Sequence, residues 1–250
     1  MNRLLSLISF IALSHYAISQ VSVTRNVGTF TEIDNQKNFD LVLKEGQEEA
    51  IVIEEMKNIE LDEIITEAKN GKLKFTAKAS KYQNSYARII VTYKRLTCIY
   101  NSGSGNILCK DRMTGSNFCL YIKGSGNFAS EAPLVFQQIK IDISGAADVK
   151  LPSIETTDLQ ISISGSGNIK IDSGQSNHQT LQINGSGSIS LSGVNNEEAE
   201  INISGSGSIG LVATKTISVV SSGSGDVSYS GRPQLKSFKN TGSTALRHID

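Results

Sequence analysis

The phrase Gly-Ser-Gly occurs six times in this 250-residue chain, beginning at Gly103, Gly124, Gly165, Gly185, Gly205 and Gly223. Weaker copies at Gly145 and Gly242 complete eight phrases, spaced 18 to 21 residues apart. A period of about 20 residues is typical of a solenoid, in which each repeat forms one coil and stacks on its neighbours. The repeat therefore constrains the architecture more than any other feature of the chain.

Aliphatic residues occupy alternate positions on both sides of the aligned glycines. Four residues before the first glycine the chain has Leu120, Ile141 and Ile161, and four residues after it Phe128, Val149 and Ile169. A period of two residues is that of a strand with one buried face. Each repeat therefore predicts two short strands joined at Gly-Ser-Gly.

Two short strands joined by a glycine turn could form either a β-hairpin or part of a coil that stacks in parallel on the next repeat. The same residue types recur at the same phase in every copy, which favours coils that stack in parallel at about 4.8 Å. We therefore predict an all-β fold: a parallel β-helix, expected to be right-handed, with coils of about 20 residues and an irregular N-terminal cap.

Glycine adopts positive φ without steric cost, so we expect the repeated glycines to form the corners of the coils. A serine column between them and an Asn/Asp column after them are expected to form hydrogen bonds along the stack. Binding of a glycan or a cation by this polar edge is the alternative. The expected corner residues are Gly103, Gly105, Gly124, Gly126, Gly165, Gly167, Gly185, Gly187, Gly205, Gly207, Gly223 and Gly225.

The first 19 residues have the composition of a secretory signal peptide. Arg3 precedes an apolar run from Leu4 to Leu13, and Ala17 and Ser19 supply small residues before the expected cleavage point. The run is too short to cross a membrane, for which about 20 residues are needed. We expect a periplasmic, cell-surface or secreted chain with no membrane span after the leader is removed.

Residues 20–95 lack the phrase but contain strand-like runs, so we interpret them as early coils and a cap, continuous with the repeat region at 96–250. The stretch Asn58 to Ala68 fits either a short helix or a loop. Removal of Arg3 with the leader leaves 23 basic and 24 acidic residues. That balance gives no basic footprint for nucleic acid, which is therefore not an expected partner.

Cys98 and Cys119 both stand five residues before a first glycine, at an outward phase of adjacent coils. They are candidates for a disulfide, because stacked coils place their Cα atoms within bonding range and export favours oxidation. Cys109 falls on an inward column and is interpreted as a small core residue.

Outward residues include Tyr100 and Tyr121, which stand three residues before successive first glycines. The two rings are expected to stack on each other, and they are also the candidate ligand face. Catalytic chemistry is poorly represented in the sequence. Asp142 and Asp148 fall on the two strands of one coil, whereas His178 is expected in a loop and His248 in the last coil. We predict no catalytic, cofactor or metal residues.

The chain resembles the head GIN domain family of putative auto-transporter adhesins, found in exported proteins of Bacteroidetes. The resemblance is carried by Arg25 to Ile33, Phe39 to Leu43 with Gly46, Asn70 to Leu73, and the serial Ser-Gly-Ser-Gly-Asn/Asp phrases. It implies a parallel β-helix outside the cytoplasm with a role in adhesion, and it carries no catalytic residue.

Three functions remain open from the sequence. The first is a non-catalytic surface module that binds a glycan or a protein. The second is a polysaccharide lyase or hydrolase, since fold alone does not decide chemistry. The third is a structural or self-associating spacer, because the edge of the final coil could pair with another copy.

Overall fold

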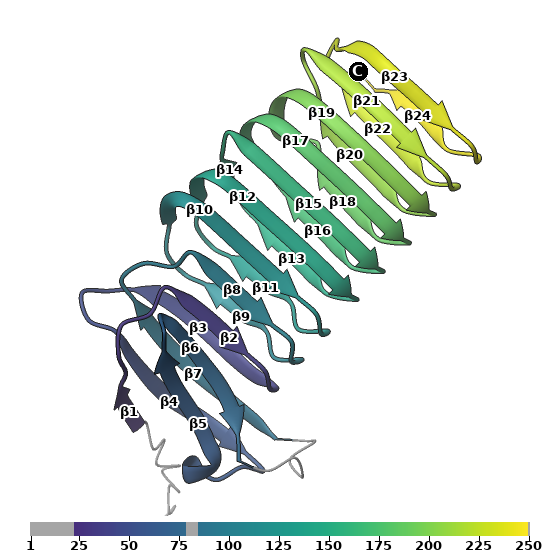
Figure 1. The fold of residues 1–250 in the computed structure, drawn as a ribbon. Coiled ribbons are helices and arrows are strands. Elements are labelled where there is room, and N and C mark those ends of the chain that lie inside the picture. Colours follow the sequence, from purple (N-terminus) through teal and green to yellow (C-terminus); the bar gives the residue numbers. More distant parts are fainter. Residues whose placement is uncertain (1–22, 79–84, 250) are drawn as a thin grey trace, which may run out of the picture.

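The computed structural model describes residues 23–78 and 85–249; the expected leader at 1–19 lies outside these ranges. The described chain forms two long sheets that face each other across one continuous core, drawn as a tall stack in Figure 1. Strands of neighbouring coils pair in parallel through the whole repeat region. The predicted all-β solenoid is therefore confirmed.

We call the two sheets sheet A and sheet B. Sheet A contains mainly short strands, which in the repeats follow the glycine corners. Its members, in spatial order, are β1 (Val23–Asn26), β4 (Ala50–Lys57), β7 (Tyr86–Tyr93), β3 (Phe39–Glu45), β9 (Ile107–Cys109), β11 (Phe128–Ser130), β13 (Asp148–Leu151), β16 (Asn168–Ile171), β18 (Ser188–Leu191), β20 (Ser208–Val212), β22 (Asp226–Ser230) and β24 (Ala245–His248).

Sheet B contains the strands that precede the corners, and several of them are long. Its members are β23 (Gln234–Asn240), β21 (Thr216–Ser221), β19 (Val194–Gly205), β17 (Gly174–Gly185), β14 (Ile154–Glu155), β15 (Asp158–Gly165), β12 (Leu134–Gly145), β10 (Met113–Ile122), β8 (Cys98–Asn101), β2 (Glu32–Asn35), β6 (Lys72–Ala77) and β5 (Ile64–Lys69). No helix in the described ranges is long and apolar enough to cross a membrane.

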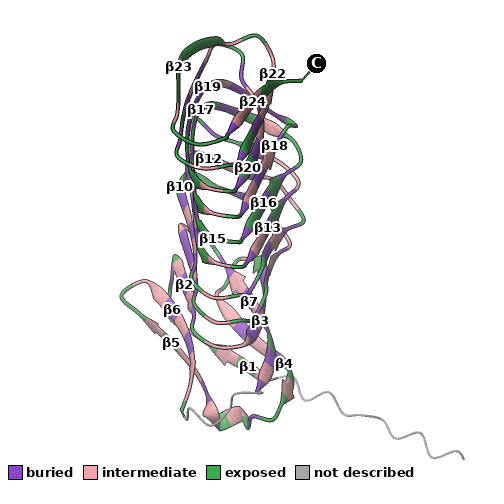
Figure 2. Ribbon diagram, turned by 90° about the vertical axis from the view of Figure 1, so that its right-hand side faces the viewer, coloured by how far each residue is buried: buried purple, intermediate pink, exposed green. Residues whose placement is uncertain are grey.

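The inward columns lie in register from coil to coil. Ile141 pairs with Ile161, which pairs with Leu181, and all three side chains are at most 1% exposed. Figure 2 shows buried residues along the strands of both sheets through the whole stack, alternating with more exposed ones. Burial of one such side chain stabilises the fold by roughly 1.5–3 kcal/mol, so the aliphatic columns hold the stack together.

The corners need glycine for two different reasons. Gly185 has a φ of +143°, and a Cβ at this position would overlap the carbonyl oxygen of Gly165 in the coil below. Gly187 points inward, and a Cβ there would lie 2.9 Å from Cγ2 of Ile163. Backbone conformation and close stacking therefore both exclude larger residues at the corner.

The middle coils differ from the prediction of two short strands. In β12 and β17 the alternation of buried and exposed residues breaks at two successive exposed residues, Gln137–Gln138 and Asn177–His178. The sheet bends there, which gives each middle coil a further side. His178, which was expected in a loop, lies on β17 at this bend; that prediction was wrong because the phase break resembles a loop in sequence.

The N-terminal segment forms coils that do not follow chain order. β2 and β3 stack against β8 and β9 of the first repeat, while β6 and β7 stack on their other side. At this end the pairing becomes antiparallel: β1 pairs with β4, β4 with β7, and β5 with β6. β1 and β5 are the last strands of sheets A and B. The stretch at 58–68 contains the 3-10 turn η1 (Leu61–Glu63) and the start of β5, rather than a longer helix.

Candidate ligand-binding face

The outer side of sheet B carries columns of polar and aromatic side chains, one residue per coil. Tyr100, Tyr121 and Asp142 lie in register on adjacent strands, and Ser162 and Gln182 continue the column. The period-two pattern places these residues outward because their neighbours in sequence occupy the aliphatic columns. We call this surface the outer face of sheet B.

Tyr100 and Tyr121 form a stacked pair on this face. Their ring centroids are 5.3 Å apart and their planes differ by 12°. Nζ of Lys72 lies 4.0 Å from the Tyr100 centroid, and Nζ of Lys140 lies 5.6 Å from the Tyr121 centroid. The pair thus stands between two cations, so a ligand meets ring edges, hydroxyls and ammonium groups before it meets a bare ring face.

A hollow of about 220 Å³ opens beside the tyrosine pair. Lys72 is held in it by an ion pair to Glu32, with Nζ and Oε2 3.1 Å apart. Desolvation opposes protonation of Lys72, but the hydrogen bond to Glu32 and its charge raise the pKa of the lysine overall. The polar and aromatic residues around the hollow include Asp34, Gln36, Lys72, Tyr100, Tyr121 and Lys123.

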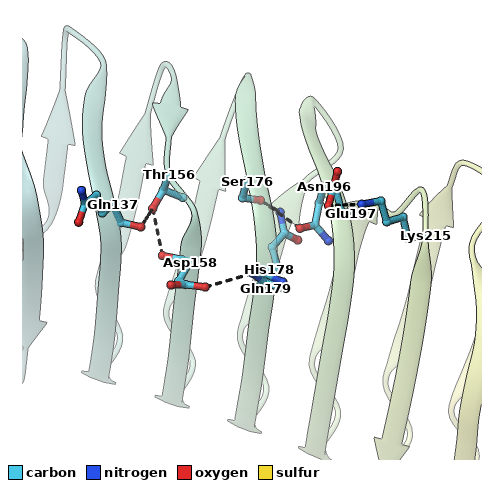
Figure 3. Close-up of polar contacts among 9 residues, drawn as sticks. All are labelled: Gln137, Thr156, Asp158, Ser176, His178, Gln179, Asn196, Glu197 and Lys215. Carbon is cyan, nitrogen blue, oxygen red and sulfur yellow. Dashed lines mark hydrogen bonds and ion pairs between the residues drawn. The ribbon is translucent and has the colours of Figure 1, made fainter.

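A groove of about 490 Å³ follows the bend of sheet B across successive coils. Nδ1 of His178 and Oδ1 of Asp158 lie 3.2 Å apart on its rim, as Figure 3 shows. Sequence reasoning did not find this groove. The two successive polar residues that interrupt the aliphatic alternation were the available signal. The outward residues that line the groove include Asn117, Gln138, Lys140, Asp158, Gln160 and His178.

Buried polar side chains support the bend from behind. Nε2 of Gln179 donates to Oγ of Ser176 (2.9 Å), and Oγ of Ser176 donates to Oδ1 of Asn196 (3.2 Å), as Figure 3 shows. Oγ1 of Thr156 donates to the carbonyl oxygens of Gln137 and Asp158 across the same bend. The network connects β17 to β19 behind the bend through Ser176 and Asn196, although Oε1 of Gln179 and Nδ2 of Asn196 are buried without a hydrogen-bond partner among the described residues.

The Asn/Asp column at the corners is engaged in a hydrogen-bonded ladder. The backbone N–H of Asp148 donates to Oδ1 of Asn127 (2.8 Å), and Nδ2 of Asn168 donates to Oδ1 of Asp148 (2.9 Å). Oγ of Ser188 continues the ladder to Oδ1 of Asn168 (2.7 Å). The column therefore stabilises the stack of corners through contacts between coils.

The three cysteines lie at the positions that the repeat phase indicates. Cys98 and Cys119 form a disulfide between adjacent strands, with Cα atoms 4.5 Å apart. Cys109 is a free, buried thiol, and burial raises its pKa. Its Sγ lies 3.7 Å from the hydroxyl of Tyr93, whose pKa burial also raises.

The candidate catalytic groups have contacts of their own. Asp142 lies on β12 and Asp148 on β13, and Asp148 belongs to the corner ladder. His248 lies on β24, where its ring packs against Tyr229 at a centroid distance of 5.3 Å. Within the described residues no group of three or more His, Cys, Asp or Glu side chains is arranged to hold a metal ion.

Fold and geometry together define a parallel β-solenoid with a polar and aromatic outer face on one sheet. The family model for "Putative auto-transporter adhesin, head GIN domain" matches residues 29–233. The chain belongs to this family, as its repeat phrases and N-terminal motifs indicated. None of the curated, functionally described proteins matches it in sequence.

Solved structures share the fold at low sequence identity. A protein of Parabacteroides distasonis described as a putative lipid binding protein is 23% identical, with a TM-score of 0.81. A putative adhesin of the same organism and one of Parabacteroides merdae are each 18% identical, with TM-scores of 0.84 and 0.83. In all three the match covers 92% of this chain and 96% of the other.

Proposed function

We propose that the protein is an exported, non-catalytic module that binds a glycan chain along the outer face of sheet B. The observation that carries this proposal is the stacked pair of Tyr100 and Tyr121 between a polar hollow and the axial groove. Aromatic rings with amide, hydroxyl and charged side chains around them are suited to a ligand rich in hydroxyl groups.

The groove has the direction that an extended polymer needs. Gln138, Asp158 and His178 stand in register on successive coils, so the groove runs across the strands and along the stack. A chain lying there would meet a new polar side chain about every 4.8 Å. Lys123 and Lys140 favour acidic sugars, because both ammonium groups line the hollow or the groove.

The names of the solved relatives offer two ligand classes, lipids and the surface partners of adhesins. A lipid chain needs an apolar cavity, whereas the space between the sheets is filled by aliphatic columns such as Ile141, Ile161 and Leu181. The hollow is lined mainly by polar, charged and aromatic residues, and the groove combines polar side chains such as Gln138 and Asp158 with apolar surface, without an enclosed apolar cavity. These observations favour a polar ligand, and a protein partner is the alternative.

An enzyme is the less favoured alternative, because Asp148 and Asp158 each have a partner other than a second carboxylate. Glycoside hydrolysis needs two carboxyl groups on either side of the scissile bond. Asp158 pairs with His178, and Asp148 accepts from Asn168 in the corner ladder. Export rests on the leader-like sequence at 1–19 and on membership of an adhesin family.

The test is a binding screen of the purified chain against immobilised neutral and acidic glycans. Replacement of Tyr100 and Tyr121 by alanine should abolish binding, and Lys123→Ala with Lys140→Ala should weaken binding to acidic glycans at least tenfold. Lys150→Ala with Lys170→Ala is the matched control, because these exposed lysines lie on sheet A. Glycan binding that survives in all variants would reject this face. Capture of a protein with no glycan bound would favour the protein alternative.

A further inference from the structure

The two ends of the solenoid carry opposite charge, although the formal net charge of the whole chain is zero. Residues 47–69 contain eight acidic residues and two lysines, and three of the acids, Glu49, Glu54 and Asp62, form ion pairs with Lys94, Arg88 and Lys78. Residues 226–249 contain four Lys or Arg and one acid, Asp226, which pairs with Arg247. The first segment supplies β4, η1 and β5, and the second supplies β22, β23 and β24. These elements lie at opposite ends of the stack in Figure 1.

The basic end leaves the interior of the solenoid open. Leu235 and Phe238 are 49% and 42% exposed, yet they pair in register with Ile217 and Val219, which are fully buried. The inner columns therefore continue onto the surface of the last coil. Among the described strands, β23 pairs only with β21 and β24 only with β22, so within the described ranges each has one edge without a partner strand.

The acidic end is closed by a side chain. The guanidinium of Arg25 on β1 donates to the carbonyl oxygens of Leu61 (2.7 Å) and Ile64 (2.6 Å). It thereby links the outermost strand of sheet A to the segment that leads into the outermost strand of sheet B. Glu60 and Glu67 are exposed beside this contact. This end offers negative charge and, among the described strands, an edge of β5 that pairs with no further strand.

We propose that the basic end of one copy docks on the acidic end of a second copy, so that the chains associate head to tail along the solenoid axis. Lysines on an edge strand disfavour pairing with an identical edge. Lys236 and Lys239 therefore oppose a contact between the basic ends of two copies. The acidic end of another copy removes that repulsion and covers Leu235 and Phe238. A head-to-tail contact of this kind does not close on itself, so it produces a growing chain. The inference does not depend on the proposed glycan site.

The experiment measures mass in solution by sedimentation and light scattering, over a range of protein concentration and salt. The parent chain should form dimers and longer species at low salt, and added salt should weaken their association because exposed charges are screened. Lys236→Glu with Lys239→Glu removes the excess of positive charge at the C-terminal end, and Glu60→Lys with Glu67→Lys reduces the negative charge of the N-terminal end. Each variant alone should be monomeric, with association weakened at least tenfold.

A mixture of the two variants should regain association as a heterodimer, because the unchanged acidic end of the first variant can dock on the unchanged basic end of the second. Lys150→Glu with Lys170→Glu, on the flank of sheet A, is the matched control and should associate like the parent. A parent chain that stays monomeric at every concentration would overturn the proposal. A dimer that persists in the variant Glu60→Lys with Glu67→Lys would also overturn the proposal, because it would indicate pairing between two basic ends. If the parent chain stays monomeric and its basic end binds the polyanion heparin, an acidic polymer is the partner of that end instead of a second copy.

Discussion

The side chain of Asn101 lies inside the core and donates from Nδ2 to the carbonyl oxygen of Gly105, 2.8 Å away. Asn35 makes the equivalent bond to Phe39 in the coil below, and its Nδ2 also donates to Oδ1 of Asn101 (3.2 Å). Asn240 repeats the bond, to Thr244, in the last coil. The first corners are thus held by buried amides and the last corner by a half-buried one, where most of the middle coils have isoleucine.

Asn101→Ala should destabilise the fold by about 1–3 kcal/mol, because it leaves the buried carbonyl of Gly105 and the amide of Asn35 with fewer partners. Urea unfolding followed by circular dichroism measures the change. Asn184→Ala is the matched control, since Asn184 is exposed on the outer side of the same sheet, and it should change stability by less than about 0.5 kcal/mol. Equal effects of the two substitutions would contradict the role assigned to the buried amide.

Gly185→Val should lower stability by about 3 kcal/mol or more, because the new side chain requires a strained φ and overlaps the coil below. Thermal unfolding provides the measurement. Gly28→Ala serves as the control, because a Cβ there would lie 3.8 Å from Cβ of Ala68, in ordinary contact. An unfolding temperature of Gly185→Val equal to that of the parent would show that the corner tolerates a side chain.

Much of the repeat region could be predicted because one physical rule governs every coil. Parallel stacking places like residues over like, so the columns through Ile141 and Ile161 can be recognised in the sequence alone. The same phase gave the outward positions of Tyr100 and Tyr121. The groove at the bend was missed, because Asn177 and His178 interrupt the alternation as a loop would.

The N-terminal coils were less predictable because alternation shows which face of a strand is buried but does not identify its neighbour. β2 lies between β8 and β6, a pairing that no spacing in the sequence encodes. The role of Asn101 was hidden for a similar reason. A polar residue in an aliphatic column indicates either an exposed position or a buried hydrogen bond, and only the path of the corner distinguishes them.

Replacement of Cys98 and Cys119 by serine should lower the free energy of unfolding by about 2–4 kcal/mol, because the disulfide closes a loop between residues 21 apart in sequence. Denaturant unfolding with and without reductant measures this effect. Mass spectrometry after alkylation should find no modified thiol in the native chain and one, at Cys109, after unfolding without reductant. Three alkylated cysteines under those conditions would contradict the disulfide.

Stability should fall at alkaline pH because of Tyr93 and Cys109. Burial raises the pKa of both groups in the folded chain, whereas the unfolded chain titrates near the ordinary values of about 10 for tyrosine and 8.5 for cysteine. The unfolded state therefore loses these protons first. The stability that the two groups contribute is fully present below pH of about 8 and is lost progressively as the pH rises through 9 and 10.

Denaturant unfolding between pH 7 and 11 measures this slope. Tyr93→Phe should flatten the decline above pH of about 10, and Cys109→Ala should flatten it from pH of about 8.5, because each substitution removes one titrating group. Phenylalanine keeps the ring in the core and loses only the weak contact to Sγ of Cys109, so stability at pH 7 should change by about 1 kcal/mol or less. A decline of the same steepness in the parent and in the double variant would show that other groups govern the alkaline transition.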